Sequence, residues 1–501
     1  MTATLETDIA IIGTGAGGGT LAYALRDVGA RVALLERGDF LPAEDENWSA
    51  ASVFGDQRYK TSELWRDERG RPFRPSMHYF VGGNTKVYGA ALARMRREDF
   101  SEYRHEDGLS PAWPITYEDL EPYYTRAEDL YGVHGATGED PTDPPRSGPY
   151  PFPAVADEPV IAALRRRLEA QGLHPYALPL GIDLRDGGLC VRCGTCDGFP
   201  CKVNAKSDAD IRCVRPALES PNVLLRTGVY VERLITTPNG ERVVEAQART
   251  RGGPLRILAD AFFVCCGAVN SAALLLRSAN PSHPDGLSNS SGLVGRNYMG
   301  HVHTAILALG PRRNRTTFQK TLAVNDYYHG DEGWPWPLGT LWLIGKAQAP
   351  MLRAAVNRLP NEIAGTLARR SVDWWACSED IPSPDRGVAV DPDGTLRITW
   401  RPTNLESHRR LVRHAKRMLR GAGYPLVLTR LMDVEFNAHQ CGTARFGTDA
   451  RDSVLDPFCR SHDVQNLFVV DSSFFPSSAV LNPVLTIAAQ ALRVADRFAA
   501  A

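Results

Sequence analysis

"TDIAIIGTGAGGGTLAYALRDVGARVALLERGD", residues 7–39, is the stretch that decides the fold. Its apolar runs predict a buried strand over 8–12 and a second over 31–35, with a helix over 18–28 between them. Gly13, Gly15 and Gly18 form a GxGxxG turn between the first strand and the helix. In such a turn the first glycine permits the tight bend, the second lets the backbone approach a pyrophosphate, and the third lets helix and strand pack closely.

The acidic residue after the second strand completes a dinucleotide-binding pattern. Glu36 would accept hydrogen bonds from a ribose, and the helix N-terminus would offer N–H groups to phosphates, with Ala16 among the residues expected to contact the cofactor. We expect Arg37 to line the same site. A GxGxxG run alone is a weak signal, because a purely structural glycine turn looks the same. Its place at the start of the chain favours FAD over NAD, by analogy with flavoproteins.

The composition is that of an ordinary globular protein. The chain has 501 residues, of which 43% are hydrophobic and 23% charged, with a formal net charge of −1. The length predicts two to four domains. The balanced charge predicts no nucleic-acid partner, and no run approaches the ~18 apolar residues of a membrane span. Ten cysteines, two of them adjacent, and the lack of a basic leader predict a reducing, cytoplasmic location.

Three later stretches are expected to join or complete the first sheet. "HYFVGGNTKVYGAALARMRREDF" (78–100) contains a second glycine-rich turn. "NVLLRTGVYVERLI" (222–235) and "LADAFFVCCGAVNSAALLLRSA" (258–279) predict a strand and then a strand–turn–helix unit. Between them, "WPITYEDLEPYYTRAEDLYGVHG" (113–135) predicts an amphipathic helix capped near Thr116. The residues expected to contact the cofactor here are Gly83, Asn84 and Val231.

The C-terminal stretch carries the second strong signal. "NLFVVDSSFFPSSAVLNPVLTIAAQALRVADRF" (466–498) predicts a buried strand ending at Asp471 and a long helix starting at Asn482–Pro483. Asn is a good N-cap, and Pro suits the first helical position. A helix N-terminus here would stabilise negative charge on a reduced flavin, although a capped helix without a ligand has the same pattern. Upstream, His439 lies among glycine turns in "FNAHQCGTARFGTD" (436–449).

Taken in this order, the motifs resemble those of the glucose–methanol–choline (GMC) family of FAD oxidoreductases. They are the GxGxxG turn with Glu36, the double glycine at 82–83, "GAVNSAALLLRS" and the His…Asn-Pro ending. "FQKTLAVNDYY" (318–328) and "CGTCDGFPCKVNAKSDAD" (193–210) are similar to bacterial pyranose oxidase-like enzymes, the branch that includes glycoside 3-oxidases acting on C-glycosides.

The resemblance implies an α/β fold. An FAD-binding Rossmann-like domain would be interleaved with an α+β substrate-binding domain built on an antiparallel sheet. We expect the FAD-binding domain to span residues 1–300, with inserted cap and loop segments at about 40–220. The substrate-binding domain would span 301–435, and 436–501 would return to the FAD-binding domain carrying the catalytic residues.

The resemblance also implies the chemistry. The enzyme would oxidise a secondary hydroxyl, at C2 or C3, of a pyranose or glycoside, with hydride passing to flavin N5 and electrons to O2 or a quinone-like acceptor. His439 would be the general base and Asn482 its hydrogen-bonding partner, because a neutral imidazole can take a proton and an amide cannot compete for it. Alternatives are an aminoglycoside-pathway dehydrogenase acting on a primary hydroxyl, an iron–sulfur sugar dehydrogenase subunit, and a non-catalytic FAD-binding protein.

Two positions depart from the family pattern. Val87 stands where fungal pyranose oxidases have the histidine that carries FAD covalently, so we expect non-covalent FAD. Gly89 stands where those enzymes have a threonine near flavin N5, so the use of O2 is expected to differ. Tryptophans 334, 336 and 342 would stack on sugar faces or belong to the core. The residues predicted to bind substrate are Gln319, Asp326, Gln348 and Gln440.

Four cysteines lie within "CVRCGTCDGFPC", residues 190–201. Their spacing, C-x2-C-x2-C-x4-C, resembles a ferredoxin run. However, Pro200 precedes the last cysteine instead of following it, and no second cysteine group completes a zinc ribbon. We therefore expect structural thiols and no metal, with an iron–sulfur cluster or zinc at Cys190, Cys193, Cys196 and Cys201 as the alternatives.

Overall fold

A five-stranded parallel sheet forms the centre of the predicted nucleotide-binding part. The computed structural model describes residues 2–356 and 358–500. The strand order is β11 (Val223–Arg226), β3 (Val32–Leu35), β2 (Ile9–Ile12), β15 (Ala261–Val264) and β23 (Leu467–Val469), and every neighbouring pair is parallel. Residues from both ends of the chain therefore share one sheet, as the sequence predicts. All residues of the central β2, β3 and β15 are buried, which explains their unbroken apolar runs.

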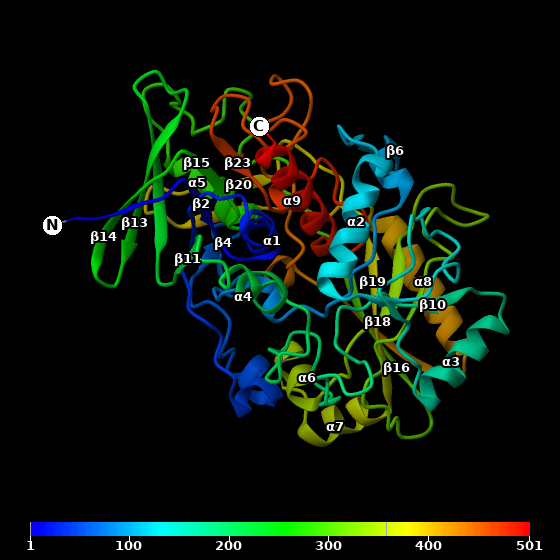
Figure 1. The fold of residues 1–501 in the computed structure, drawn as a ribbon. Coiled ribbons are helices and arrows are strands. Elements are labelled where there is room, and N and C mark those ends of the chain that lie inside the picture. The colour runs from blue at the N-terminus through cyan, green and yellow to red at the C-terminus, as the bar shows by residue number, and fades with distance from the viewer. Residues whose placement is uncertain (1, 357, 501) are drawn as a thin grey trace.

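Three helices lie beside this sheet (Figure 1). Helix α9 (Val484–Ala499) packs against both α1 (Ala16–Leu25) and α2 (Tyr117–Tyr131). α2 begins after Thr116, whose side chain accepts a hydrogen bond from Asp119 N, so the predicted cap is confirmed. α9 begins slightly later than predicted. Pro483, not Asn482, is its N-cap, and the carbonyl of Pro483 accepts the hydrogen bond from Ile487 N in the first turn. The Asn482 side chain is therefore not used to cap the helix.

A six-stranded antiparallel sheet forms the second large layer. Its order is β10 (Pro175–Ala177), β17 (Leu322–Val324), β18 (Thr340–Leu343), β19 (Ser371–Ser378), β16 (Val302–Leu309) and β22 (Leu426–Leu431). α8 (Leu405–Gly421) and α3 (Pro159–Glu169) contribute apolar side chains to the core against one face, and α8 packs directly on β19 and β16 (Figure 1). The opposite face carries Trp342 and Cys377, which pack with Val480 and Leu481 just before α9.

Two smaller four-stranded sheets complete the framework. One has the order β1 (Ala3–Glu6), β14 (Gly253–Leu258), β13 (Val243–Thr250), β12 (Tyr230–Thr236), and the other β20 (Gly387–Val390), β21 (Leu396–Thr399), β4 (Trp65–Arg66), β5 (Pro72–Phe73). The remaining helices are α4 (Arg215–Ala217), α5 (Ala268–Arg277), α6 (Ala349–Ala355) and α7 (Asn361–Arg370), and the remaining strands form the pairs β6 (Tyr103–Arg104) with β7 (Leu109–Ser110) and β8 (His134–Gly135) with β9 (Phe152–Pro153).

Strand pairing crosses the expected domain boundary near residue 300. β10, from the predicted FAD-binding segment, pairs with β17, and β4 pairs with β21. The antiparallel sheet is thus confirmed, while the division 1–300, 301–435 and 436–501 stays a prediction that the sheets do not follow closely. Among residues 2–356 and 358–500, no helix combines the length and the apolar run that crossing a bilayer requires.

Candidate active site

The glycine turn at the end of β2 has open space at Gly15 and is closely packed at Gly13 and Gly18. A Cβ at Gly13 or Gly18 would overlap neighbouring backbone carbonyls, and Gly13 also has a φ of +104°. A Cβ at Gly15, by contrast, would meet no heavy atom within 4 Å. Gly83 of the second glycine turn lies against it, since a Cβ there would be 3.2 Å from Gly15 Cα. The two turns that the sequence predicts as cofactor contacts therefore adjoin one free space.

That free space suits a pyrophosphate. No side chain caps the N-terminus of α1, which begins at Ala16, so its first N–H groups have no side-chain acceptor. Such a terminus binds anions through its N–H groups and its dipole. The residues present thus fit the pyrophosphate of a dinucleotide.

The predicted ribose end lies next to this turn. Glu36 is buried, which raises the pKa of its carboxyl group, and it accepts hydrogen bonds from Thr14 Oγ1 at 2.5 Å and Gly38 N at 2.9 Å. Arg37 lies between the rings of Tyr79 and Tyr230, 3.8 and 4.5 Å from their centroids. Val231, predicted to contact the cofactor, directly follows Tyr230 in β12.

Two other predicted cofactor residues hold the surrounding backbone. Asn84 Oδ1 accepts from His78 N at 3.0 Å. Asp471 Oδ2 accepts from Gly267 N at 2.8 Å and Ser271 Oγ at 2.5 Å, and so joins the turn before α5 to the end of β23. Their contacts with a cofactor stay predictions, but the structure gives both a framework role.

His439 and Asn482 meet, as the sequence predicts. Asn482 Nδ2 lies 3.4 Å from His439 Nε2, across 43 residues of chain. Both side chains remain partly exposed. The Cys377 thiol donates to Val480 O at 3.2 Å, which fixes the loop before α9 on β19. His303, the strand partner of Cys377 in β16, has its ring centroid 5.0 Å from that of His439.

A second histidine that the sequence analysis missed touches the predicted base. His301 Nδ1 lies 3.0 Å from His439 Nδ1, and His301 Nε2 lies 3.0 Å from Ser478 O. His301 directly precedes β16 and His303 is its second residue, and a spacing of two residues in extended backbone places both side chains on one face. That spacing is the signal that could have identified them.

The pKa of each of the three imidazoles is lowered, which favours their neutral forms. Burial lowers the pKa of His439 well below the ordinary histidine value, and the nearby His301 and Lys320 lower it further. Burial and the neighbouring histidines do the same to the pKa of His303. Burial also lowers the pKa of His301, although the carboxylate of Glu379 acts in the opposite direction on that group.

The same three histidines are the one set of potential metal ligands in residues 2–356 and 358–500 whose donor atoms all lie within 4.8 Å of one another. A metal ion there would compete with the hydrogen bonds that already engage both nitrogens of His301. The four cysteines of residues 190–201 form no such set in the described chain. Whether any metal binds stays a prediction.

Family models match most of the sites just described. A model described as GMC oxidoreductase, N-terminal, matches residues 69–303, and a model of the C-terminal part matches residues 385–491, which include His439 and Asn482.

The chain belongs to the GMC oxidoreductase family.

Related sequences align with nearly the whole chain. The 6'''-hydroxyparomomycin C oxidase of Streptomyces lividus is 34% identical, and the paromamine 6'-oxidase of Streptomyces fradiae 32%. Each alignment covers 98% of this chain and 91% of the relative. Pyridoxine 4-oxidase from Mesorbium loti has the same fold, with a TM-score of 0.68 at 19% identity over 98% of this chain and 99% of that one. The protein is therefore a GMC-type oxidoreductase, of a family that binds FAD.

The residues predicted to bind substrate are not gathered at this GMC site. Gln319 is 1% exposed and its Nε2 donates to Asp373 Oδ2 and Ile344 O, so it has no N–H left for a sugar. Asp326 follows β17, three strand spacings or roughly 14 Å from β16. Gln348 precedes α6 and its Nε2 lies 3.4 Å from Gly194 O. Gln440 adjoins His439, but its Nε2 donates to Asn437 O at 3.1 Å.

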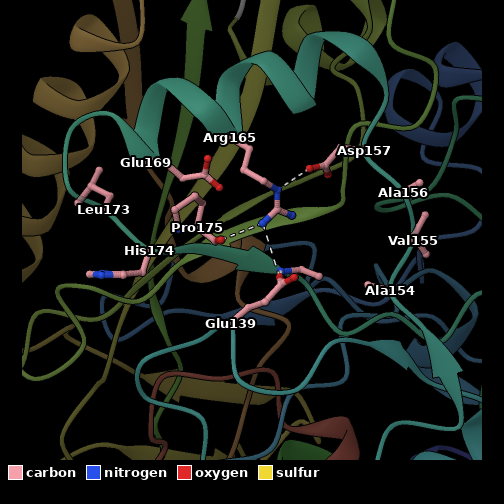
Figure 2. A pocket seen from close by; sticks show the side chains of 11 residues that line it. Glu139, Ala154, Val155, Ala156, Asp157, Arg165, Glu169, Leu173, His174 and Pro175 are labelled. Atoms are coloured by element: carbon pink, nitrogen blue, oxygen red, sulfur yellow. Dashed lines mark hydrogen bonds and ion pairs between the residues drawn. The ribbon is translucent and has the colours of Figure 1, made fainter.

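Asp326 instead supports a surface hollow at the outer edge of the six-stranded sheet. It accepts from His174 Nδ1 at 2.7 Å, and His174 lines this hollow of about 460 Å³ (Figure 2). Arg165 points into the same hollow but is bonded to Asp157 Oδ2 at 2.6 Å and to Pro175 O at 2.8 Å. Because Arg165 also lies 3.6 Å from a carboxylate oxygen of Glu139, two carboxylates offset its positive charge in the hollow.

Trp334 and Trp342 pack on opposite faces of the six-stranded sheet. Trp334 Nε1 donates to Ser407 Oγ at 3.0 Å and the ring packs on the α8 side of the sheet, away from the catalytic face. Trp342 is 3% exposed, yet its ring centroid lies 6.3 Å from that of His303. Trp375, which the sequence analysis passed over, lies 5.5 Å from His303 by the same measure.

The cysteine loop packs beside the second glycine turn. Gly198 N donates to Val87 O at 2.9 Å, and Asp197 forms an ion pair with Lys320, whose Nζ donates to Gly89 O at 2.7 Å. Burial raises the pKa of Cys196 to about 12, so this thiol stays protonated at neutral pH.

Proposed function

We propose that this GMC oxidoreductase oxidises a secondary hydroxyl, at C2 or C3, of a neutral pyranose or glycoside to the ketone, using non-covalently held FAD. The observation that carries the proposal is the pair formed by His439 Nε2 and Asn482 Nδ2, 3.4 Å apart and accessible to solvent. A base and an amide donor at this separation can bind the same alcohol oxygen. The neighbouring Trp375, which is half-buried, adds aromatic surface of the kind that packs against sugar rings, whereas Trp342 is buried.

Each member of the pair has a distinct task. His439, neutral because burial lowers its pKa, accepts the hydroxyl proton at Nε2. Asn482 donates an N–H to the alcohol oxygen and cannot take its proton. As the proton leaves, negative charge grows on the oxygen, and the amide stabilises it. Loss of the proton makes the adjacent C–H bond a better hydride donor. After the reaction, the carbonyl oxygen of the product faces the Asn482 amide, and His439 is protonated.

The cofactor would be held by the residues at the end of β2 and β3. Gly15 and the N-terminus of α1 would bind the pyrophosphate, and Glu36 with Arg37 the adenosine half. Flavin supplies a two-electron acceptor for the substrate hydride. Val87 has no group that can bond to it covalently. A Cβ at Gly89 would overlap the ends of the Asp197 and Lys320 side chains, so a threonine at this position would require that ion pair to move. Electrons would then pass to O2 or a quinone-like acceptor.

A second candidate is oxidation of a primary hydroxyl of an aminoglycoside. It is favoured by the names of the two relatives at 34% and 32% identity. Aminoglycosides carry several ammonium groups, which proteins usually bind with carboxylates. The charged side chain that shifts the pKa of His439 is the cationic Lys320, which disfavours an ammonium group beside the base, while the carboxylate of Glu379 acts on the more distant His301.

Anaerobic flavin bleaching separates the candidates. The purified protein would be mixed with glucose, a C-glycoside or paromamine, and the flavin absorbance followed. Reduction by glucose or the C-glycoside, with a 2- or 3-keto product, would support the proposal. Reduction by paromamine alone, with a 6'-aldehyde product, would support the second candidate. His439→Ala should slow reduction by ~10²-fold or more.

A further inference from the structure

His301 lies beside the predicted base for a reason that can be traced in the backbone. Met299 and Cys441 exchange two backbone hydrogen bonds of 3.0 Å as an antiparallel bridge. In antiparallel pairing, the residue two places after one partner lies opposite the residue two places before the other. The bridge therefore sets His301 opposite His439. The two rings meet edge to face, with centroids 4.9 Å apart.

The far end of His301 is anchored to a carbonyl. Ser478 O can only accept, so His301 Nε2, 3.0 Å away, must carry the proton of that bond. The carbonyl is held in place because Asp380 N donates to Ser478 Oγ at 3.2 Å, and that hydroxyl lies 3.0 Å from Asp380 O. The next residue, Ala479, has a φ of +48°, a left-handed conformation that is unfavourable for a side chain with a Cβ. The fold thus keeps a strained residue where this carbonyl is oriented.

The proton positions follow in sequence. A neutral imidazole has one N–H, and burial lowers the pKa of His301, so its Nδ1 carries a lone pair. This lone pair can bond to His439 Nδ1, 3.0 Å away, only if His439 carries its proton on Nδ1. His439 Nε2 is then free of a proton on the side that faces Asn482.

We propose that His301 is a positioning residue that holds His439 in the tautomer whose Nε2 is free to accept the substrate proton. This rests on the proposed role of His439 as the base. Without the acceptor at His301 Nδ1, His439 could place its proton on either nitrogen and could rotate. With the proton on Nε2, His439 would donate to the alcohol oxygen instead of accepting from it. His301 itself remains one residue removed from the substrate.

A matched pair of variants tests this role. His301→Asn places an amide oxygen where Nδ1 was and keeps the acceptor for His439, whereas His301→Phe keeps a planar ring and removes both nitrogens. Anaerobic stopped flow would give the rate of flavin reduction at saturating sugar and the apparent sugar Kd. We expect His301→Phe to lose ~10²- to 10⁴-fold in rate with the Kd changed less than about threefold, as for loss of a tautomer-fixing group in a catalytic triad. His301→Asn should recover to within about tenfold of wild type.

Three outcomes would overturn the proposal. They are a wild-type rate for His301→Phe, equal losses in the two variants, and a loss confined to the sugar Kd. His439→Ala is the control: if it keeps the wild-type rate, the proposed function fails instead. If His301→Phe does not fold, long-range ¹H–¹⁵N spectra of the wild-type holoenzyme labelled at histidine settle the matter. They should show His439 protonated at Nδ1, and protonation at Nε2 would refute the proposal.

Discussion

Gly15 and Gly18 belong to one motif, yet the structure predicts opposite consequences for replacing them with alanine. The backbone at Gly15 has φ −66° and ψ −163°, which alanine adopts without strain, and a Cβ there meets no heavy atom within 4 Å. Gly15→Ala should therefore change the free energy of unfolding of the apoprotein by less than about 1 kcal/mol, because a small gain in chain stiffness is offset by a weaker N-cap. The added methyl group would occupy the space expected for the pyrophosphate.

At Gly18 the Cβ would overlap the carbonyl oxygen of Gly13 and lie 3.1 Å from Cys265 Cβ. The turn and α1 would have to separate, and overpacking of this kind costs about 1–3 kcal/mol. Gly18→Ala should thus lower the free energy of unfolding, whereas Gly15→Ala should spare it and weaken FAD binding by about tenfold or more, equivalent to 1.4 kcal/mol.

The assay compares both variants with wild type in two measurements. Urea unfolding of the apoproteins, followed by tryptophan fluorescence, gives stability, and ultrafiltration after FAD titration gives the Kd. The reasoning would be refuted if Gly15→Ala bound FAD as tightly as wild type, or if it destabilised the apoprotein as much as Gly18→Ala. Either result would mean that the free space beside Gly15 is not the pyrophosphate site.

Three further predictions concern protonation and thiols. Because the pKa of His439 lies well below its ordinary value, the rate of flavin reduction should stay level between pH 8 and about 6; a decline with an apparent pKa near 6.5 in stopped-flow data would contradict this. Burial lowers the pKa of His408 to about 3, so as the pH falls from 6.5 toward 3 the unfolded chain takes up this proton before the folded one. The His408 contribution to the free energy of unfolding therefore falls by about 1.4 kcal/mol per pH unit in this range. In urea titrations, the dependence of the free energy of unfolding on pH should be smaller by one proton in His408→Gln, and an unchanged dependence would count against this. Replacing all four cysteines of residues 190–201 by serine should leave the flavin spectrum and the rate unaltered; stoichiometric iron or zinc in the wild-type protein that is absent from the serine variant would show that the thiols hold a metal.

The local parts of the fold could be predicted because their causes lie within a few residues. The GxGxxG turn and the Thr116 cap each depend on neighbours in sequence, and both appear where expected. The start of α9 was placed wrongly by one residue for an equally local reason. Pro483 occupies the cap position and no side chain caps the helix, so the Asn482 side chain is free to face His439.

The rest depends on contacts that no local pattern records. His301 meets His439 through the bridge between Met299 and Cys441, which joins segments about 140 residues apart. Likewise β10 joins β17 from far along the chain. Gln319 had the right chemistry for a sugar ligand, but Asp373 and Ile344 O already satisfy its amide. Side-chain type therefore gave the reaction class more reliably than the substrate contacts.

The packing of α9 against α1 has a consequence for how such enzymes diversify. Asn482 stands at the start of α9, and α9 packs on the helix whose N-terminus adjoins the glycine turns. Redox machinery and amide donor thus form one inherited block. The half-buried Trp375 belongs to a separate sheet, which touches that block through the packing of Trp342 and Cys377 on Val480 and can otherwise change its outward residues. Directed evolution toward new sugars should therefore accumulate substitutions on β18 and β19, while the α1–α9 pair stays fixed.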